Sequence, residues 1–429
     1  MKDYWSGRAG FILAAIGSAV GLGSIWKFPY EVGANGGAAF VLCYLAGLLI
    51  AVVPLMFAEF AIGRRGGGDA AASIAALAAA HGAARAWSWV GVLGVVTGAL
   101  ILSFYSVIGG WTIAYAVDAR RDYAELLASP GRMIAYHALF LALAAAIVAR
   151  GVGRGIEAAT RVLMPLLALL MVALAAYSMV YGDVRATLRF LFRLDFAGFS
   201  ARAALEALGL GFFSIGVGMG VMITYAAYAG KAIDLRQAAV WSIVADTAIS
   251  LAAGFAVFPV VFANALDPAS GPGLMFVTLP LAFARMPLGT LAAAAFFALL
   301  FVAALASAVS MLELAVALVA RRCGWSRVKA SAGVSAACFV AGLATVFSFN
   351  RWGHWRPTAF EALDDLTSNL LLPAGGFALA LFAGWALPRA VLAEELALGP
   401  RGAALLHAML RWVTPALIAL VSLAPALLR

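Results

Sequence analysis

The sequence feature that most constrains the fold is a glycine-rich interruption inside an apolar segment near the N-terminus. Residues 17–28 read GSAVGLGSIWKF, with Gly17, Gly21 and Gly23 inside a stretch that is hydrophobic enough to cross a membrane. Glycine weakens a regular helix, and an unwound segment at membrane depth is tolerated only where its backbone amides and carbonyls line a cavity. The segment therefore predicts a transporter with a broken membrane helix.

Composition supports a membrane location for the whole chain. Of the 429 residues, 65% are hydrophobic and 11% are charged, so a soluble domain of this composition would expose far too much apolar surface. The sequence predicts an all-α integral membrane protein with eleven apolar segments, each long enough to cross about 30 Å of hydrocarbon. They lie at 9–29, 38–63, 87–117, 133–150, 158–181, 203–229, 237–264, 288–320, 328–348, 368–388 and 408–428.

Charge sets the expected orientation. The net charge of +9 comes from short Lys and Arg clusters between the apolar segments, which is typical of membrane loops and does not indicate a nucleic-acid partner. More of the 29 Lys and Arg residues fall on the N-terminal side of the bilayer than on the other. We therefore expect a multi-pass protein of a bacterial-type inner (plasma) membrane, with the N-terminus in the cytoplasm and the C-terminus outside.

A second segment breaks the rules of helix formation in the same way. Residues 209–225 read GLGFFSIGVGMGVMITY, with Gly216, Gly218 and Gly220 in the middle of the sixth span. Glycines that only permit close helix packing are the alternative explanation. Because the two breaks lie five spans apart, they predict a 5+5 inverted repeat with unwound helices 1 and 6 and a site between them. The expected single transporter domain has repeats at about 9–181 and 203–388 and an extra helix at about 408–428.

These motifs carry a family resemblance over essentially the whole chain. The runs GSAVGLGSIWKFPYEVGANGGAAFVLCY, PLMFAEFAIGR and FFSIGVGMGVMITYAAY resemble the neurotransmitter sodium symporter family, and its bacterial amino-acid transporters in particular. The resemblance implies a leucine-transporter-like fold that carries an amino acid with sodium by alternating access. It also implies eleven spans, as in other bacterial members.

An amino-acid zwitterion needs hydrogen-bond donors for its carboxylate and acceptors for its ammonium group. The free amides near Leu22 and Gly23, at the positive end of a half-helix, suit the carboxylate. The resemblance adds the hydroxyl of Tyr105, for which core packing is the alternative role. The ammonium group is then expected to meet the carbonyls of Ala19 and Phe213 and the hydroxyl of Ser214. 

The resemblance also places the pocket for the substrate side chain. Gly21 stands where members that carry monoamines have an aspartate, so a substrate with its own carboxylate, a hydrophobic L-amino acid, is expected. The missing side chain of Gly216 suggests room for a large aliphatic or aromatic group. The expected pocket residues are Ser18, Ile101, Phe213, Gly216, Met219, Ser307, Ala308 and Met311.

Two cation sites are implied, and both depart from the family pattern. The second would use the carbonyls of Gly17, Val20 and Ala303 and the hydroxyl of Ser307. Its usual threonine is Ala306 here. The loss of one oxygen costs about 1.5 to 3 kcal/mol, on the scale of a hydrogen bond to a charged group, so this site is expected to be weak or empty.

The first cation site would consist of Ala19, Ser24, Ser214 and Asp246, with Asp246 where an asparagine is usual. A carboxylate in the middle of a span costs at least about 2.5 kcal/mol unless it is neutral or paired. Asp246 would either ligate Na+ or take up H+ as the coupling ion; uncoupled exchange is a third possibility. Chloride dependence is not expected, since Leu210 replaces a polar ligand, although Tyr44, Ser214 and Ser250 remain.

The resemblance also implies gates on both sides of the substrate. Lys27 and Asp364 stand where the family closes its outer vestibule with an ion pair. On the inner side, Lys2 would face Arg321 in place of an acid, so closure is expected to depend on Trp5 packing or Tyr228. For the intramembrane carboxylates Glu59 and Glu313, we expect a structural role against backbone amides.

An intramembrane enzyme is the alternative from another class. The four histidines are scattered, without a metal-binding HExxH motif, paired carboxylates at helical spacing or a phosphate-binding loop. The sequence therefore predicts a transporter and no catalytic residues. A non-transporting amino-acid sensor on the same fold is a further alternative, which a flux measurement would distinguish.

Overall fold

The computed structural model describes residues 4–118, 123–194, 196, 199–268 and 273–427. In these ranges the chain forms helices and connecting turns, with no β-strand. Nine helices are long and apolar enough to cross a membrane. They are Ala38–Gly66, Arg85–Val117, Pro130–Ala149, Val152–Tyr181, Leu235–Ala263, Gly289–Cys323, Arg327–Ser348, Ala359–Ala386 and Pro400–Leu423.

The two predicted helix breaks are present. The first span consists of α1 (Arg8–Ala19), η1 (Gly23–Lys27) and α2 (Phe28–Ala34), and its two halves meet at an angle of 51°. The sixth consists of α11 (Ala201–Ile215) and α12 (Val221–Ala226). Within the described ranges, the nine long helices and the bent first pair give up to ten spans by length and composition. The broken helix α11–α12 would be the eleventh, so the predicted number of eleven is consistent with the structure.

The break in the sixth span requires glycine. Gly216, Gly218 and Gly220 have φ values of +70°, +95° and +82°, in the left-handed region that other residues rarely adopt. At Gly218 a side chain would also collide, because its Cβ would lie 2.6 Å from the backbone nitrogen of Gly376 in α18 (Leu372–Leu381). Conformation and close packing therefore fix the position of this break.

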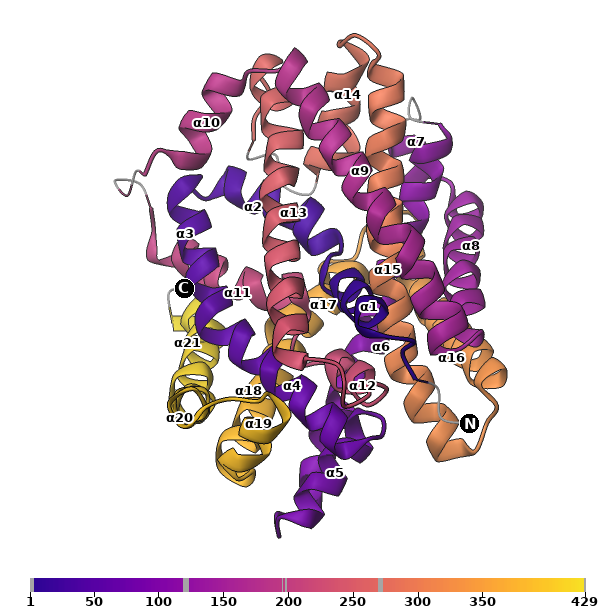
Figure 1. Ribbon diagram of the computed structural model, residues 1–429. Helices are drawn as coiled ribbons and strands as arrows, with labels where there is room; N and C mark the ends of the chain where they lie inside the picture. The colour runs from indigo at the N-terminus through magenta and orange to yellow at the C-terminus, as the bar shows by residue number, and fades with distance from the viewer. Residues whose placement is uncertain (1–3, 119–122, 195, 197–198, 269–272, 428–429) are drawn as a thin grey trace.

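The breaks lie at the centre of the bundle (Figure 1). Around them pack α6 (Ser88–Val117), α13 (Leu235–Ala263) and α15 (Gly289–Cys323). Small residues let these elements approach closely; a Cβ at Gly94 of α6 would lie 2.1 Å from the carbonyl oxygen of Met219. The core is therefore built around the unwound backbone.

The remaining helices form the periphery and the two ends of the bundle. One end carries α7 (Tyr123–Leu127), α10 (Val184–Phe192) and α14 (Leu279–Ala284), and the other carries α5 (Ala70–Ala80) and α19 (Arg389–Glu395) (Figure 1). The peripheral spans are α3 (Ala38–Gly47), η2 (Leu48–Val52), α4 (Val53–Gly66), α8 (Pro130–Ala149), η4 (Val152–Glu157), α9 (Ala158–Tyr181), α16 (Arg327–Ser348), α17 (Ala359–Asp365), η6 (Leu366–Leu371), η7 (Phe382–Ala386), α20 (Pro400–Ala408), η8 (Met409–Val413) and α21 (Thr414–Leu427).

Candidate functional site

A small cavity of about 50 Å³ lies where the two helix breaks meet α6 and α15. Its volume is enough for a few water molecules at most, so a bulky substrate requires side chains to move. Eleven predicted residues line it: Ser18, Gly21, Leu22, Gly23, Ile101, Tyr105, Ser214, Gly216, Met219, Ser307 and Met311. The sequence analysis did not name three further lining residues, Ile215, Val221 and Leu372. The side chain of Phe213 lies outside the described part of the chain.

The space beside Gly216 is taken up in this conformation. A Cβ at Gly216 would lie 2.5 Å from the terminal methyl carbon of Met219. The expected room for a large side chain is therefore filled by a methionine, a flexible and unbranched residue that can adopt other rotamers. Rotation of Met219 would enlarge the cavity on this side.

At the break in the first span, a backbone amide and two side-chain hydroxyl groups lie close together beside the cavity. The amide of Leu22 donates a hydrogen bond of 3.2 Å to the hydroxyl oxygen of Tyr105, a buried residue. A Cβ at Gly21 would lie 2.6 Å from the Ser307 hydroxyl and 3.2 Å from that of Tyr105. An acidic side chain at Gly21 would therefore displace Ser307, whereas a carboxylate brought by a substrate would meet the amides of the half-helix.

A buried group of oxygens adjoins the cavity at the predicted first cation site. The Asp246 cluster, as we call it, consists of Asp246 on α13, Ser24 on η1, Ser214 on α11 and Tyr44 on α3. The Asp246 carboxylate accepts hydrogen bonds from Ser24, from Ser214 at 3.1 Å and from Tyr44 at 3.2 Å. The Ser24 and Ser214 hydroxyls lie 3.1 Å apart.

The donor set of this cluster fits a hard cation. Asp246 is fully buried, and within the described ranges no lysine or arginine forms an ion pair with it. Hydroxyl groups can rotate and present lone pairs to a metal ion, and hard cations prefer several oxygen ligands. The arrangement can therefore hold either a monovalent metal ion or a proton on Asp246.

The predicted second cation site has fewer oxygens. Ser307 on α15 donates to the carbonyl oxygens of Val20, Ser18 and Gly17 at 3.1, 3.3 and 3.5 Å. Ala306 beside it is buried and has no side-chain oxygen. Ala303 lies one turn earlier on the same helix. One hydroxyl therefore faces the carbonyls that a cation would need.

The two other intramembrane carboxylates have different partners. The carboxylate of Glu59 accepts hydrogen bonds from the amides of Gly218 at 2.6 Å and Met222 at 3.1 Å, which confirms its predicted structural role. For Glu313, the structural role is supported but the partners found differ from the expected backbone amides. Its carboxylate forms an ion pair with Arg327 and accepts a hydrogen bond from Tyr228 at 3.0 Å. These side chains lie on α16 and in the turn after α12, and sequence spacing did not indicate them.

The structure shows two contacts at the N-terminal end of the bundle that were not predicted from the sequence. Arg321 forms an ion pair of 3.3 Å with Asp69, the N-cap residue of α5. The buried carboxylate of Glu157 accepts hydrogen bonds from the backbone and side chain of Ser6. In the sequence, both contacts were marked only by an acidic residue near the end of a span. Acidic residues are common there, so neither contact could be predicted. Lys2 lies outside the described residues.

Trp5, which was expected to contribute to closure on the inner side, is buried and packs against aromatic residues. Its indole nitrogen donates to the carbonyl oxygen of Tyr225 at 2.8 Å, and its ring contacts those of Tyr225 and Phe11. On the other side of the cavity, Lys27 ends η1 and Asp364 lies on α17, where it accepts a hydrogen bond of 2.9 Å from Ser368. The Lys27–Asp364 gate stays a prediction.

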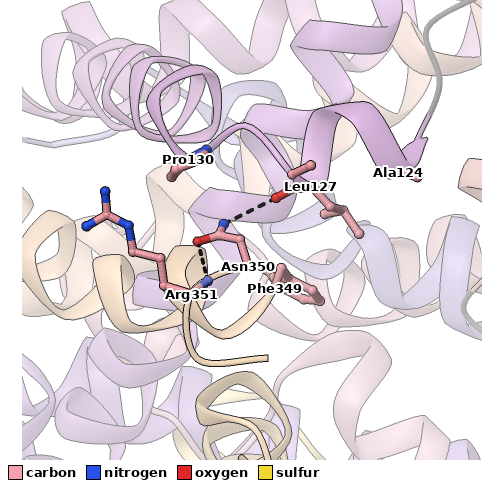
Figure 2. Close-up of a pocket in the computed structure, with 7 residues that line it drawn as sticks. Ala124, Leu127, Pro130, Phe349, Asn350 and Arg351 are labelled. Carbon is pink, nitrogen blue, oxygen red and sulfur yellow. Dashed lines mark hydrogen bonds between the residues drawn. The ribbon is translucent and has the colours of Figure 1, made fainter. Parts of the chain in front are cut away.

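A larger pocket lies elsewhere. A depression of about 650 Å³ lies between α7, the start of α8 and the segment after α16. Leu127, Pro130, Phe349, Asn350 and Arg351 are among the residues that line it (Figure 2). The Asn350 side chain donates to the carbonyl oxygen of Leu127 at 3.2 Å, so its amide is already engaged. Because the depression is broadly open and has few convergent polar groups, the small central cavity is the better candidate site.

Comparisons with known proteins agree with this geometry. The family model described as "Sodium:neurotransmitter symporter family" matches residues 2–124 and 120–427. The chain belongs to this family. It is therefore a multi-pass membrane transporter and not an enzyme.

Relatives extend over nearly all of the symporter chain. A Bacillus subtilis protein named "Uncharacterized sodium-dependent transporter YhdH" is 34% identical over 98% of this chain and 96% of its own length. The crystal structure of MhsT in complex with L-phenylalanine superposes with a TM-score of 0.92 at 39% identity, covering 99% of this chain and 100% of MhsT. The bovine sodium-dependent dopamine transporter is 27% identical over 73% of this chain and 53% of its own.

Proposed function

We propose that this symporter carries a hydrophobic L-amino acid together with Na+ by alternating access around the central cavity. The observation that carries the proposal is the position of Ser214. It lines the cavity and also donates to the Asp246 carboxylate at 3.1 Å. One hydroxyl therefore touches both the space for substrate and the cluster for a cation, which gives the two ligands a direct physical connection.

The cavity supports the substrate class. The amides near Leu22 and Gly23 and the hydroxyl of Tyr105 would receive the carboxylate, and the carbonyl of Ala19 with Ser214 would receive the ammonium group. The apolar side chains of Ile101, Met219 and Met311 would surround the substrate side chain. MhsT was solved with L-phenylalanine, so an aromatic amino acid is the first substrate to test.

Sodium is the coupling ion that the donor sets favour. The Asp246 cluster offers a carboxylate and three hydroxyls, and several relatives are named sodium-dependent transporters. Tyr44 and Ser214 donate to Asp246, so the hydroxyls that could bind chloride are already occupied by a negative charge of the protein itself. We therefore propose transport without chloride. A proton on Asp246 is the alternative that the same burial supports.

The proposed mechanism uses two five-helix halves, about 9–181 and 203–388, in a membrane with the N-terminus in the cytoplasm. Trp5, the Arg321–Asp69 pair and the Glu157–Ser6 contact would then close the cytoplasmic side. Release of these contacts would let α1 move and open the cavity inward.

The test is uptake of labelled L-phenylalanine by the purified protein in liposomes. Three conditions separate the possibilities: an inward sodium gradient, an inward proton gradient, and neither. Concentrative uptake only with the sodium gradient is expected. Concentrative uptake with the proton gradient alone would favour the proton alternative, and binding without flux would indicate a sensor.

A further inference from the structure

A second polar feature lies on the lipid-facing surface, where the end of α18–η7 meets η8. The indole rings of Trp385 and Trp412 lie edge to face, with centroids 4.8 Å apart and planes at 75°. Both side chains are half exposed or more, at 50% and 59%. Arg411 lies beside both rings, with its guanidinium carbon 4.1 Å from the Trp385 ring centroid and 5.5 Å from that of Trp412.

The helices hold this arrangement firmly. The Trp385 indole nitrogen donates to the carbonyl oxygen of Arg411 at 3.0 Å. A Cβ at Gly384 would lie 2.7 Å from the backbone of Arg411, so the two segments touch at this point. Trp385 belongs to the last turn of its span, and Arg411 is level with it. Because Trp385 lies at the end of its span, we expect the neighbouring guanidinium near the depth of the lipid headgroups, although the apolar helix Pro400–Leu423 begins before Arg411.

Arg411 lacks an acidic partner among the described residues. Across the ranges that the structure describes, no carboxylate forms an ion pair with it, and its Nε atom is buried without a hydrogen-bond partner. Arg389 and Arg411 are both close enough to His407 to act on it electrostatically, so two positive charges gather here. The nearby acids Glu394 and Glu395 are paired with Arg65 and Arg64. The surface is therefore positive, uncompensated and flanked by apolar rings.

We propose that Arg411, packed against Trp385 and Trp412, binds the phosphate of an anionic phospholipid in the leaflet on the N-terminal side. Tryptophan rings alone are common at membrane interfaces. A guanidinium without an acidic partner beside two of them is a more specific arrangement, because it pairs a phosphate with its planar donors while the rings pack against the glycerol and upper acyl chain. Basic pockets between membrane helices are known to take such headgroups.

The experiment measures thermal unfolding of the full-length protein in neutral detergent while phosphatidylglycerol is added. A ligand that binds the folded state raises the unfolding midpoint in proportion to its occupancy. Parallel titrations use phosphatidylcholine, which is zwitterionic, and inorganic phosphate, which has no acyl chain. We expect the midpoint to rise with phosphatidylglycerol well beyond the rise with either control ligand.

The variants are Arg411→Gln and, as a matched control, Arg322→Gln, which removes an exposed charge at the same end of the bundle. The half-effect concentration of phosphatidylglycerol should rise about fivefold in Arg411→Gln, since one basic residue near the membrane surface contributes about 1 kcal/mol. Arg322→Gln should behave like the wild type. An unchanged half-effect concentration in Arg411→Gln, or an equal response to phosphatidylcholine or inorganic phosphate, would overturn the proposal.

If Arg411→Gln does not fold, Arg411→Lys and Trp385→Leu replace it. Arg411→Lys keeps the charge without the planar donors. Trp385→Leu keeps the arginine but removes one of the two indole rings that pack against it. Both should weaken the phosphatidylglycerol response. A wild-type response in both would also overturn the proposal.

Discussion

The two predicted cation sites lie on either side of the first helix break, and they differ sharply in the side-chain oxygens they offer. On one side, the Asp246 cluster combines a carboxylate with the hydroxyls of Ser24, Ser214 and Tyr44. On the other side, Ser307 is the hydroxyl that faces the backbone carbonyls, and Ala306 adds no oxygen. From this comparison we propose that cation binding in this symporter is concentrated in the Asp246 cluster.

The largest change in sodium affinity is expected from removing a hydroxyl of the Asp246 cluster. Ser24→Ala should lower sodium affinity roughly 10- to 150-fold, because a ligand to a charged group contributes about 1.5 to 3 kcal/mol. Ser307→Ala is the matched change on the other side and should lower sodium affinity less. Sodium-dependent thermal stabilisation of the purified proteins measures both. A larger loss in Ser307→Ala would reverse the comparison.

A loss of substrate affinity of similar size is expected from a change beside the break in the first span. Tyr105→Phe removes the hydroxyl that lies 3.2 Å from the Leu22 amide and changes little volume. Substrate affinity should fall by about 1.5 to 3 kcal/mol, with the unfolding midpoint near that of the wild type. Binding of L-phenylalanine at saturating sodium is the measurement. Unchanged affinity would place Tyr105 outside the substrate site.

A smaller change, this time a gain in sodium affinity, is expected from adding a hydroxyl to the predicted second cation site. Ala306→Thr places a hydroxyl beside Ser307 and should raise sodium-dependent thermal stability by mass action. The gain should lie at the lower end of the range for one oxygen ligand, about 1.5 kcal/mol or tenfold in affinity, because Ala306 is buried and its surroundings are packed for a smaller side chain. Ala306→Val, which has a similar shape and no hydroxyl, is the control. No gain over Ala306→Val would show that more than one ligand is missing there.

The sequence predicted the fold and the contents of the cavity because both depend on local features. Glycine runs in apolar segments mark the helix breaks, and the positive φ values of Gly216, Gly218 and Gly220 account for them. Asp246 could be identified from the sequence because a carboxylate within an apolar span is energetically costly and is usually functional. The resemblance then supplied the pocket residues on α6 and α15.

The features that were missed depend on contacts between distant residues. Arg321 and Asp69 are 252 positions apart, and each alone looks like an ordinary charge at a helix end. Tyr44 was assigned only to the remnant of a chloride site, but the structure places its hydroxyl 3.2 Å from Asp246. The position of Met219 depends on its rotamer, which sequence does not specify. Such details require the packed structure.

The central claim is that Asp246 couples sodium to substrate. Its most direct test is concentrative uptake by wild-type and Asp246→Asn protein in liposomes, across external pH and with sodium or choline as the cation. The substitution removes the charge and keeps the shape. We predict that the mutant still requires sodium but needs more of it, with little change in pH dependence. Loss of accumulation driven by a pH gradient would instead assign the proton to Asp246, and wild-type-like uptake under every condition would contradict any coupling role.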